Sequence, residues 1–447
     1  MSEIDIKISH ITIDNIKNIE HGHISFMNNE DILKVTGIYG ANGSGKTSIV
    51  TVLELVKTFI LGQEINVRML DLIPENKTSE VNVCYYIRGK QEYFIEYYIR
   101  LIKDSDNTYQ PHINILEERI RYKENQPNKK FKKAIHFNAE ENSISPSSVN
   151  KSDLITLFNY ILLEAKKQQT SLLFSSLFSG FIDNHLKTKE YQSLRELFDL
   201  LINIQQNTFI YENNLHALSQ TDIAMPLLFS LNNHVQGTTT LPLSQSSKMN
   251  EPKYELSKMI IKQINQVLPT IIPSLSIELK VIDHNIDNHN QNEYTTILMA
   301  KRGNNIFPFR AESEGIKKIV SILSALIFSY NYPNVIVIVD EFDSGIFEFL
   351  LGQLLEVFNN RMRGQFIFTA HNLRPLENLS VKNIVFTTCN DNPKYIRLKN
   401  IKSSNNLRKV YLNQIQTNSN HYDLYQPIPD VKLKSAFRRA YNIVKED

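Results

Sequence analysis

Residues 40–47 read Gly40-Ala41-Asn42-Gly43-Ser44-Gly45-Lys46-Thr47, and this stretch decides the fold. It matches G-x-x-x-x-G-K-[ST], the pattern of a phosphate-binding loop. Glycines let the backbone turn tightly enough for several N–H groups to point at one phosphate chain. The pattern predicts that Lys46 reaches the β- and γ-phosphates and that Thr47 holds Mg²⁺. The residues expected to bind the nucleotide are Gly40, Asn42, Gly43, Ser44, Gly45, Lys46, Thr47 and Ser48.

The sequence on either side of the loop supports this interpretation. Residues Ile32–Ile38 predict a buried strand, and Ser48–Lys57 has the apolar spacing of a helix. A helix that begins at the loop adds the positive end of its dipole to the anion site. The alternative is a glycine-rich turn without a ligand, which the order of strand, loop and helix disfavours.

A second stretch supplies carboxylates. Residues Val335–Val339 are all Val or Ile, and Asp340 and Glu341 follow them. Such a run predicts a central parallel strand that is buried on both faces. Its carboxyl end is where ligands bind in open α/β sheets. We expect Asp340 to hold Mg²⁺ and Glu341 to polarise the attacking water as general base.

The separation of the two motifs is diagnostic, because about 300 residues lie between Thr47 and Asp340. In this separation the chain resembles ATPases of the ABC superfamily, such as the SMC, RecF and OLD groups, in which a large insertion divides one nucleotide-binding core. That class predicts three more elements. Ser313 and Gly315 would open a helix that offers a second anion site. Asp343–Gly345 would form a turn at the interface of a pair, and His371 would end the next strand and sense the γ-phosphate.

The remaining sequence predicts an α/β protein with an ABC-type P-loop ATPase core, which has a mixed central sheet, flanking helices and an antiparallel β meander, plus a helical insertion. Aromatic and β-branched residues within 78–137 predict the meander. Helical spacing dominates 150–268, where Thr238–Asn250 is expected to be a loop. Strands return after Ser274, and His284 and His289 lie in an expected hairpin tip rather than a metal site. We divide the chain into an N-terminal lobe of the core (1–148), the insertion (149–270) and a C-terminal lobe (271–447).

Composition narrows the class of protein. The chain has 447 residues with 42% hydrophobic residues and a net charge of +2, so nucleic acid would have to bind to a local patch. Cys84 and Cys389 are the only cysteines, which predicts neither a disulfide framework nor a zinc site. The N-terminus is not a secretory signal, and no apolar run is long enough to span a membrane. We expect a soluble, cytoplasmic protein.

These motifs resemble the AAA-type ATPases of bacterial abortive-infection and phage-defence systems, which are relatives of the OLD-family ATPase domain. The stretches that carry the resemblance are Gly40–Thr47, Glu312–Gly315, Asp340–Gly345, Thr369–Glu377 and Asn406–Leu412. The resemblance implies that the protein hydrolyses ATP with Mg²⁺ and forms an ATP-dependent dimer or higher oligomer. Each ATP would lie between the Lys46 loop of one copy and Ser313 and Gly315 of another.

The resemblance also assigns catalytic roles to Lys46, Glu341 and His371, but the chain departs from it in two places. Phe347 stands where many relatives carry histidine after the acidic pair. No Mg²⁺-contacting glutamine can be placed between the loop and the insertion, because Gln91 lies in a generic turn.

The partner of such an ATPase is expected to be a separate protein. OLD-type proteins carry a Toprim nuclease domain after the ATPase, whereas here only about 75 residues follow His371, without the acidic cluster of a nuclease. An effector such as a Toprim-like nuclease or a toxin would then be encoded separately. DNA or RNA is a possible further partner through the basic run Asn128–Lys133, although lysines there also suit a solvated strand edge. The same holds for a basic terminal helix with Lys432, Lys434, Arg438 and Arg439.

Three other functions compete with the defence ATPase. A RecF- or SMC-like repair ATPase acting on DNA shares all the motifs, but residues 150–268 predict short helices rather than long heptads. The nucleotide-binding subunit of a transporter is disfavoured by the long insertion and by a signature unlike Leu-Ser-Gly-Gly-Gln. A scaffold that binds ATP without hydrolysis would not need Glu341.

Overall fold

The structure is a computed structural model of the chain. It describes residues 4–29, 31–104, 112–141, 143–145, 151–184, 189–212, 224–231, 234–243, 245–286, 291–390, 392–398, 406–417, 423–424 and 429–443. Within these residues, no helix combines the length and the apolar character that a membrane crossing requires.

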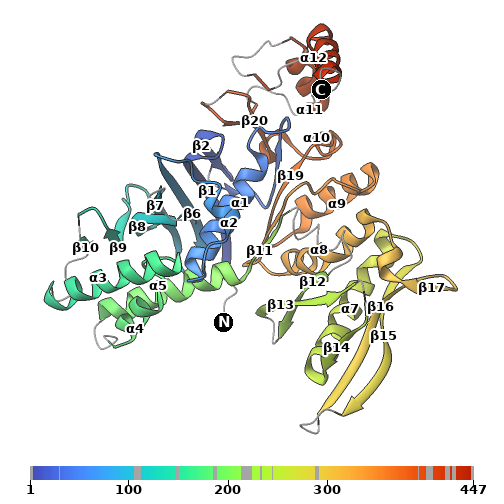
Figure 1. Cartoon of the computed structure of the whole chain (residues 1–447), viewed down its shortest axis with the longest axis horizontal. Helices are drawn as coiled ribbons and strands as arrows, with labels where there is room; N and C mark the ends of the chain where they lie inside the picture. The colour runs from blue at the N-terminus through green and yellow to red at the C-terminus, as the bar shows by residue number, and fades with distance from the viewer. Residues whose placement is uncertain are drawn as a thin grey trace.

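A mixed sheet forms the centre of the molecule (Figure 1). Across the sheet its strands, as far as the structure describes the chain, are β11 (Thr208–Tyr211), β18 (Ile336–Val339), β19 (Gln365–Ala370), β5 (Val35–Tyr39), β20 (Ile384–Thr387) and β21 (Tyr395–Ile396). The first five strands run parallel, and β21 pairs antiparallel with β20. The expected central strand before Asp340 is therefore confirmed, and so is the mixed sheet.

Helices cover both faces of this sheet, which explains why its strands are apolar throughout. On β18, Ile336 and Ile338 belong to the core that contains α1 (Lys46–Ile60), while Val337 and Val339 belong to the core beneath α8 (Glu314–Asn331) and α9 (Glu348–Arg361). Successive side chains of a strand point to opposite faces, so a strand buried on both faces needs apolar residues at every position.

The predicted β meander is a second, antiparallel sheet. In spatial order the described strands are β10 (Ser143–Ser145), β9 (Lys132–Asn138), β8 (His112–Glu124), β7 (Glu92–Asp104), β6 (Thr78–Arg88), β1 (Asp5–Ile16) and β2 (Ile19–Ser25). The register of β6 with β7 places the turn at Gly89–Gln91, as expected from the sequence. The short strands β3 (Met27–Asn28) and β4 (Asp31–Ile32) form a separate hairpin.

Helices form at both ends of the expected insertion, but the expectation of a loop at Thr238–Asn250 is wrong. Helices α3 (Lys151–Gln168), α4 (Ser176–Asn184) and α5 (Lys189–Gln206) form as expected, but β11 then joins the central sheet. The stretch expected to be a loop contains parts of β13 (His234–Pro242) and β14 (Ser247–Asn250), and β13 pairs with β12 (Ala224–Leu231). The polar composition of this stretch indicated a loop. Threonine is polar but also favours strands, so the composition did not reveal the hairpin. The domain boundaries themselves stay predictions.

A third β unit begins within the expected insertion and continues beyond it. Helix α7 (Glu251–Ile271) packs on a sheet of β14, β16 (Asn292–Arg302), β15 (Leu275–Ile286) and β17 (Asn305–Pro308). His284 lies in β15, where its ring stacks on Tyr294 at 4.6 Å, whereas His289 is outside the described residues. Figure 1 shows this unit and helices α3–α5 at opposite ends of the molecule, with the central sheet between them. The other elements are α2 (Val67–Leu70), η1 (Phe309–Ala311), α10 (Pro375–Asn378), η2 (Val381–Asn383), α11 (Leu407–Thr417) and α12 (Asp430–Ile443).

Candidate nucleotide-binding site

The glycine-rich loop joins β5 to α1 at the carboxyl edge of the central sheet. Gly43 and Gly45 have φ angles of 75° and 102°, in the region that L side chains rarely adopt, and Gly45 caps α1. Gly40 needs its small size instead, because a Cβ there would lie 1.7 Å from Oγ1 of Thr387. The loop thus has the turn geometry of an anion site at a helix N-terminus.

Lys46 is held against this loop. It is buried, and its Nζ donates hydrogen bonds of 2.8 Å to the carbonyl oxygens of both Gly40 and Ala41. Burial lowers the pKa of Lys46, while the carboxylates of Asp340 and Glu341 act in the opposite direction. The ammonium group is therefore desolvated beside the loop and within electrostatic reach of the acidic pair.

Asp340 lies at the end of β18 and is fully buried. Its Oδ1 accepts a hydrogen bond from Thr369, while burial raises its pKa and the hydroxyls of Thr369 and Thr47 lower it. Its other oxygen, Oδ2, is buried and accepts no hydrogen bond from the described residues. A buried carboxylate oxygen without a donor is costly unless a cation binds it. The hydroxyl of Thr47 and the free oxygen of Asp340 therefore fit Mg²⁺, which prefers oxygen ligands.

Glu341 adopts an unusual backbone conformation. Its φ of 49° is left-handed, which costs a residue with a side chain roughly 1–2 kcal/mol. Two contacts hold it there: its N–H donates to Oγ1 of Thr369 at 2.7 Å, and its carbonyl oxygen accepts from Nζ of Lys318. Strained residues of this kind concentrate at functional sites.

His371 follows β19 at the same edge of the sheet. Its backbone N–H and that of Asn372 both donate to Oδ2 of Asp343, at 2.9 and 2.5 Å. The expected turn after the acidic pair is thereby tied to the end of β19. The imidazole of His371 is exposed and, within the described part of the chain, has no hydrogen-bond partner.

Ser313 and Gly315 lie at the start of α8, as the sequence indicates. Ser313 is exposed at the N-cap position, and its hydroxyl makes no capping hydrogen bond. The backbone of Gly315 lies against Gly345, so a Cβ on Gly315 would be 1.8 Å from the carbonyl oxygen of Gly345. Among the described residues, no hydrogen bond or ion pair joins Ser313 or Gly315 to Gly40–Ser48. Within the described residues, the start of α8 and the phosphate-binding loop therefore make no direct polar contact with each other.

The close approach of two glycines makes a prediction about stability. Gly315→Ala should lower the free energy of unfolding by about 2 kcal/mol, because the new methyl group meets backbone that cannot rotate away. Chemical denaturation measures this change. Gly180→Ala is the matched control: it lies in α4 with open space around its Cα, so stability should stay the same or rise by up to ~1 kcal/mol. Equal stability of the two variants would contradict the predicted contact.

Sequence reasoning missed two charged residues of the site. Glu212 directly follows β11. The N–H of Asp340 donates a 2.9 Å hydrogen bond to the carbonyl oxygen of Tyr211, the last residue of that strand. Glu212 therefore lies beside Asp340 at the edge of the sheet. The side chain of Glu212 is 8% exposed. The burial of Glu54 and the nearby carboxylate of Glu212 together raise the pKa of Glu54 to about 7. In the sequence, the short apolar stretch Thr208–Tyr211 was the available sign of a strand that ends at Glu212.

Gln91, the residue considered as a contact for Mg²⁺, lies in the turn between β6 and β7.

Lys318 is the second missed residue. It lies one turn after Gly315 on α8, is buried, and donates to the carbonyl of Glu341. Burial lowers its pKa to about 8, which the carboxylates of Asp343 and Glu341 oppose. In the sequence, a lysine within the predominantly apolar face of a predicted helix was the sign that Lys318 has a buried partner. Lys318 connects the helix of Ser313 directly to the acidic pair.

The basic run of the sequence lies on the meander. Lys130, Lys132 and Lys133 are exposed, and Lys129 pairs with Glu124 at 3.3 Å. The ring of Phe131 is already occupied, since Lys123 and Arg121 lie 4.8 and 5.4 Å from its centre. The aromatic residue is therefore not free to stack on a base in this arrangement. Nucleic-acid binding by this run stays a prediction.

The strand order, the loop after β5 and the acidic pair after β18 define a P-loop ATPase domain of the ABC type. A family model described as "AAA domain, putative AbiEii toxin, Type IV TA system" matches residues 35–376, which is more than half of the chain. The chain therefore belongs to this family of AAA domains. No curated protein sequence matches the chain.

Solved structures with low sequence identity include heads of SMC proteins and RecF. An SMC head bound to the C-winged helix domain of ScpA is 15% identical, with a TM-score of 0.42 over 88% of this chain and 97% of that one. The SMC head domain from Thermotoga maritima is 11% identical, with a TM-score of 0.38 over 88% and 99%. The recombination mediator RecF with ATPrS is 14% identical, with a TM-score of 0.37 over 89% and 99%. The fold class rests on the strand order and on the geometry of the site.

Proposed function

We propose that this protein binds and hydrolyses ATP in a site that two copies share, and that its ATP state gates a separate effector in bacterial anti-phage defence. The observation that carries the proposal is the buried Oδ2 of Asp340, which lacks a donor among the described residues and lies near the hydroxyl of Thr47. The buried Oδ2 of Asp340 favours a cation, because it has no hydrogen-bond donor among the described residues. The N–H groups of the neighbouring loop favour an anion. Mg²⁺ with a nucleoside triphosphate satisfies both.

Each residue has a role in hydrolysis. The N–H groups of the loop and the ammonium of Lys46 bind the β- and γ-phosphates, and Lys46 exchanges its present carbonyl partners for phosphate oxygens. Mg²⁺ bound by Thr47 and Asp340 would supply charge neutralisation on the same phosphates. Glu341 accepts a proton from the attacking water, and the imidazole of His371 contacts the γ-phosphate.

Pairing of two copies follows from the separation of the half-sites. Neither the loop nor the start of α8 surrounds a γ-phosphate alone, so ATP would bridge Lys46 of one copy and Ser313 and Gly315 of its partner. Hydrolysis removes that bridge, because the γ-phosphate is its central part. Lys318 and the Gly315–Gly345 contact would transmit the change within each copy.

The defence role rests on the description of the family, which names a putative AbiEii toxin and a type IV toxin–antitoxin system. An ATPase that opens and closes as a pair suits control of another protein. The effector, a toxin or a Toprim-like nuclease, would be the product of a neighbouring gene.

A plaque assay tests the defence role. Expression of the chain together with its neighbouring genes should lower phage plating, and Lys46→Ala in the same cluster should restore plating to the level of an empty vector. Lys34→Ala, at an exposed lysine outside the loop, is the control and should still protect. Protection that survives Lys46→Ala, or no protection by the intact cluster against a broad phage panel, would contradict this role.

A further inference from the structure

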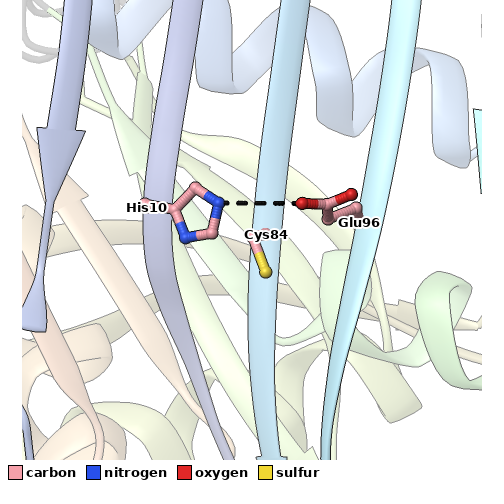
Figure 2. A group of neighbouring side chains, drawn as sticks. All are labelled: His10, Cys84 and Glu96. Atoms are coloured by element: carbon pink, nitrogen blue, oxygen red, sulfur yellow. Dashed lines mark ion pairs between the residues drawn. The ribbon is translucent and has the colours of Figure 1, made fainter. Parts of the chain in front are cut away.

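A second group of chemically reactive side chains lies away from the nucleotide site, on the outer face of the meander. His10 on β1, Cys84 on β6 and Glu96 on β7 come from three neighbouring strands (Figure 2). The register places His10 opposite Cys84 and Cys84 opposite Glu96. One ligand atom from each residue lies within 4.8 Å of the other two. Cross-strand neighbours are held by the backbone ladder, so this grouping is fixed by the sheet.

The ring of His10 lies beside Ser9, which offers a partner for a proton on Nδ1. The hydroxyl of Ser9 donates to the carbonyl oxygen of Cys84 at 3.0 Å. The Ser9 oxygen is also 3.1 Å from Nδ1 of His10, where either group can donate according to the tautomer of the ring. With the proton on Nδ1, the ring presents the lone pair of Nε2 to the cluster.

The carboxylate of Glu96 turns a free oxygen toward that lone pair. Arg121 occupies Oε2 through Nε at 2.9 Å and Nη2 at 2.6 Å. Oε1 lies 3.9 Å from Nε2 of His10, and none of the described residues donates a hydrogen bond to it. When the ring carries its proton on Nδ1, Nε2 and Oε1 are two acceptor atoms that face each other, and they form an ion pair only when the ring is doubly protonated. A cation between the two atoms would relieve this arrangement.

Cys84 provides the third donor atom and is itself shielded from solvent. It is fully buried in a small apolar cluster with Tyr86 and Phe94, which Met27, Ile32 and Phe131 cover. The side chain of His10 is 27% exposed and leaves a path from solvent to the cluster.

We propose that His10, Cys84 and Glu96 bind one zinc ion through Nε2, Sγ and Oε1, with water as the fourth ligand. Imidazole, thiolate and carboxylate are the ligands that Zn²⁺ takes, and four-coordinate sites with three protein ligands accept a water. Binding breaks the S–H bond of Cys84, forms the Zn–S bond and releases the proton to solvent. The two anionic ligands balance the charge of the ion, and Arg121 keeps its own contact with Glu96.

The site would clamp three strands of the meander together. Strand β1 continues into the β1–β2 turn, where the side chain of Asn18 donates to the carbonyl oxygen of Gly43 in the phosphate-binding loop. The zinc site would therefore stabilise the strand that supports this turn. It does not depend on the proposed ATPase function, since the two ligand sets share no residue.

Titration of the reduced, full-length protein with Co²⁺ tests the proposal. We expect a thiolate-to-cobalt charge-transfer band that saturates at one equivalent and disappears when Zn²⁺ is added. Cys84→Ser should abolish the band, and Cys389→Ser, at the other free cysteine, should retain it. Lys46→Ala should also retain it, which separates this site from the nucleotide site.

Two further variants distinguish the loss of a zinc ligand from a loss of folding. His10→Asn and Glu96→Gln should each weaken Co²⁺ binding at least about tenfold while circular dichroism remains that of the unaltered protein. The proposal is overturned if the unaltered protein gives no band, or if the band persists in Cys84→Ser. Unchanged affinity in both folded His10 and Glu96 variants would equally remove these residues as ligands.

Discussion

Glu341→Gln should lower the rate of ATP hydrolysis by at least about 100-fold while ATP stays bound. The amide cannot accept a proton from the attacking water, but it keeps the size and the hydrogen-bonding capacity of the carboxylate. The backbone contacts of Glu341 to Thr369 and Lys318 involve main-chain atoms, so the left-handed turn should survive the change. Because ATP is no longer consumed, pairs of chains should accumulate.

Phosphate release and light scattering in the presence of ATP and Mg²⁺ measure the two parts of this prediction. Glu356→Gln is the matched control, since Glu356 is an exposed glutamate on α9 and is not among the residues assigned to the site. It should hydrolyse ATP at the rate of the unaltered protein and show no extra pairing. Turnover in Glu341→Gln equal to that of the control would remove Glu341 as the general base.

Lys46→Ala should weaken ATP binding by at least about 100-fold, since hydrogen bonds from a charged donor contribute roughly 1.5–3 kcal/mol each. The ammonium is desolvated and already directed at two carbonyl oxygens of the loop, so little ordering is needed when phosphate replaces them. Removal of Lys46 leaves the loop backbone and Thr47 in place, and the variant should fold normally.

Equilibrium binding of a fluorescent ATP analogue checks the loss of affinity. Lys34→Ala, at an exposed lysine before β5, should bind as the unaltered protein does. Unaltered affinity of Lys46→Ala would show that the nucleotide binds elsewhere and would overturn the assignment of the loop.

The parts of the fold that the sequence predicted are those in which a local pattern has one physical solution. A glycine-rich loop between a buried strand and a helix, and an apolar run that ends in Asp340 and Glu341, both require a parallel sheet with its ligand edge at those residues. The meander was equally predictable, because β6 and β7 are long and are joined by a short turn.

Other features depend on contacts between distant segments and left little local signal. Strand β11 has only four residues and follows a long helix, so the local sequence does not indicate that it pairs with β18. The position of Glu212 depends on that pairing and therefore follows only from the folded sheet. The hydrogen bond from Lys318 to Glu341 joins a helix to a turn and has no sequence spacing to reveal it. The grouping of His10, Cys84 and Glu96 required the register of three strands. The spacing of the cysteines predicted no zinc site, and the proposed one departs from that expectation because its ligands come from distant segments.

The shared ATP site is the central claim, and complementation between two inactive variants tests it most directly. Lys46→Ala damages only the loop, and Ser313→Arg only the start of α8, where the side chain is exposed and its change should not disturb folding. In an equal mixture about half of the pairs are mixed, and each mixed pair has one complete site. The account predicts that each variant alone is inactive and that the mixture recovers about a quarter of the unaltered rate of ATP hydrolysis. A mixture as inactive as its separate components, or full activity of Ser313→Arg alone, would contradict it.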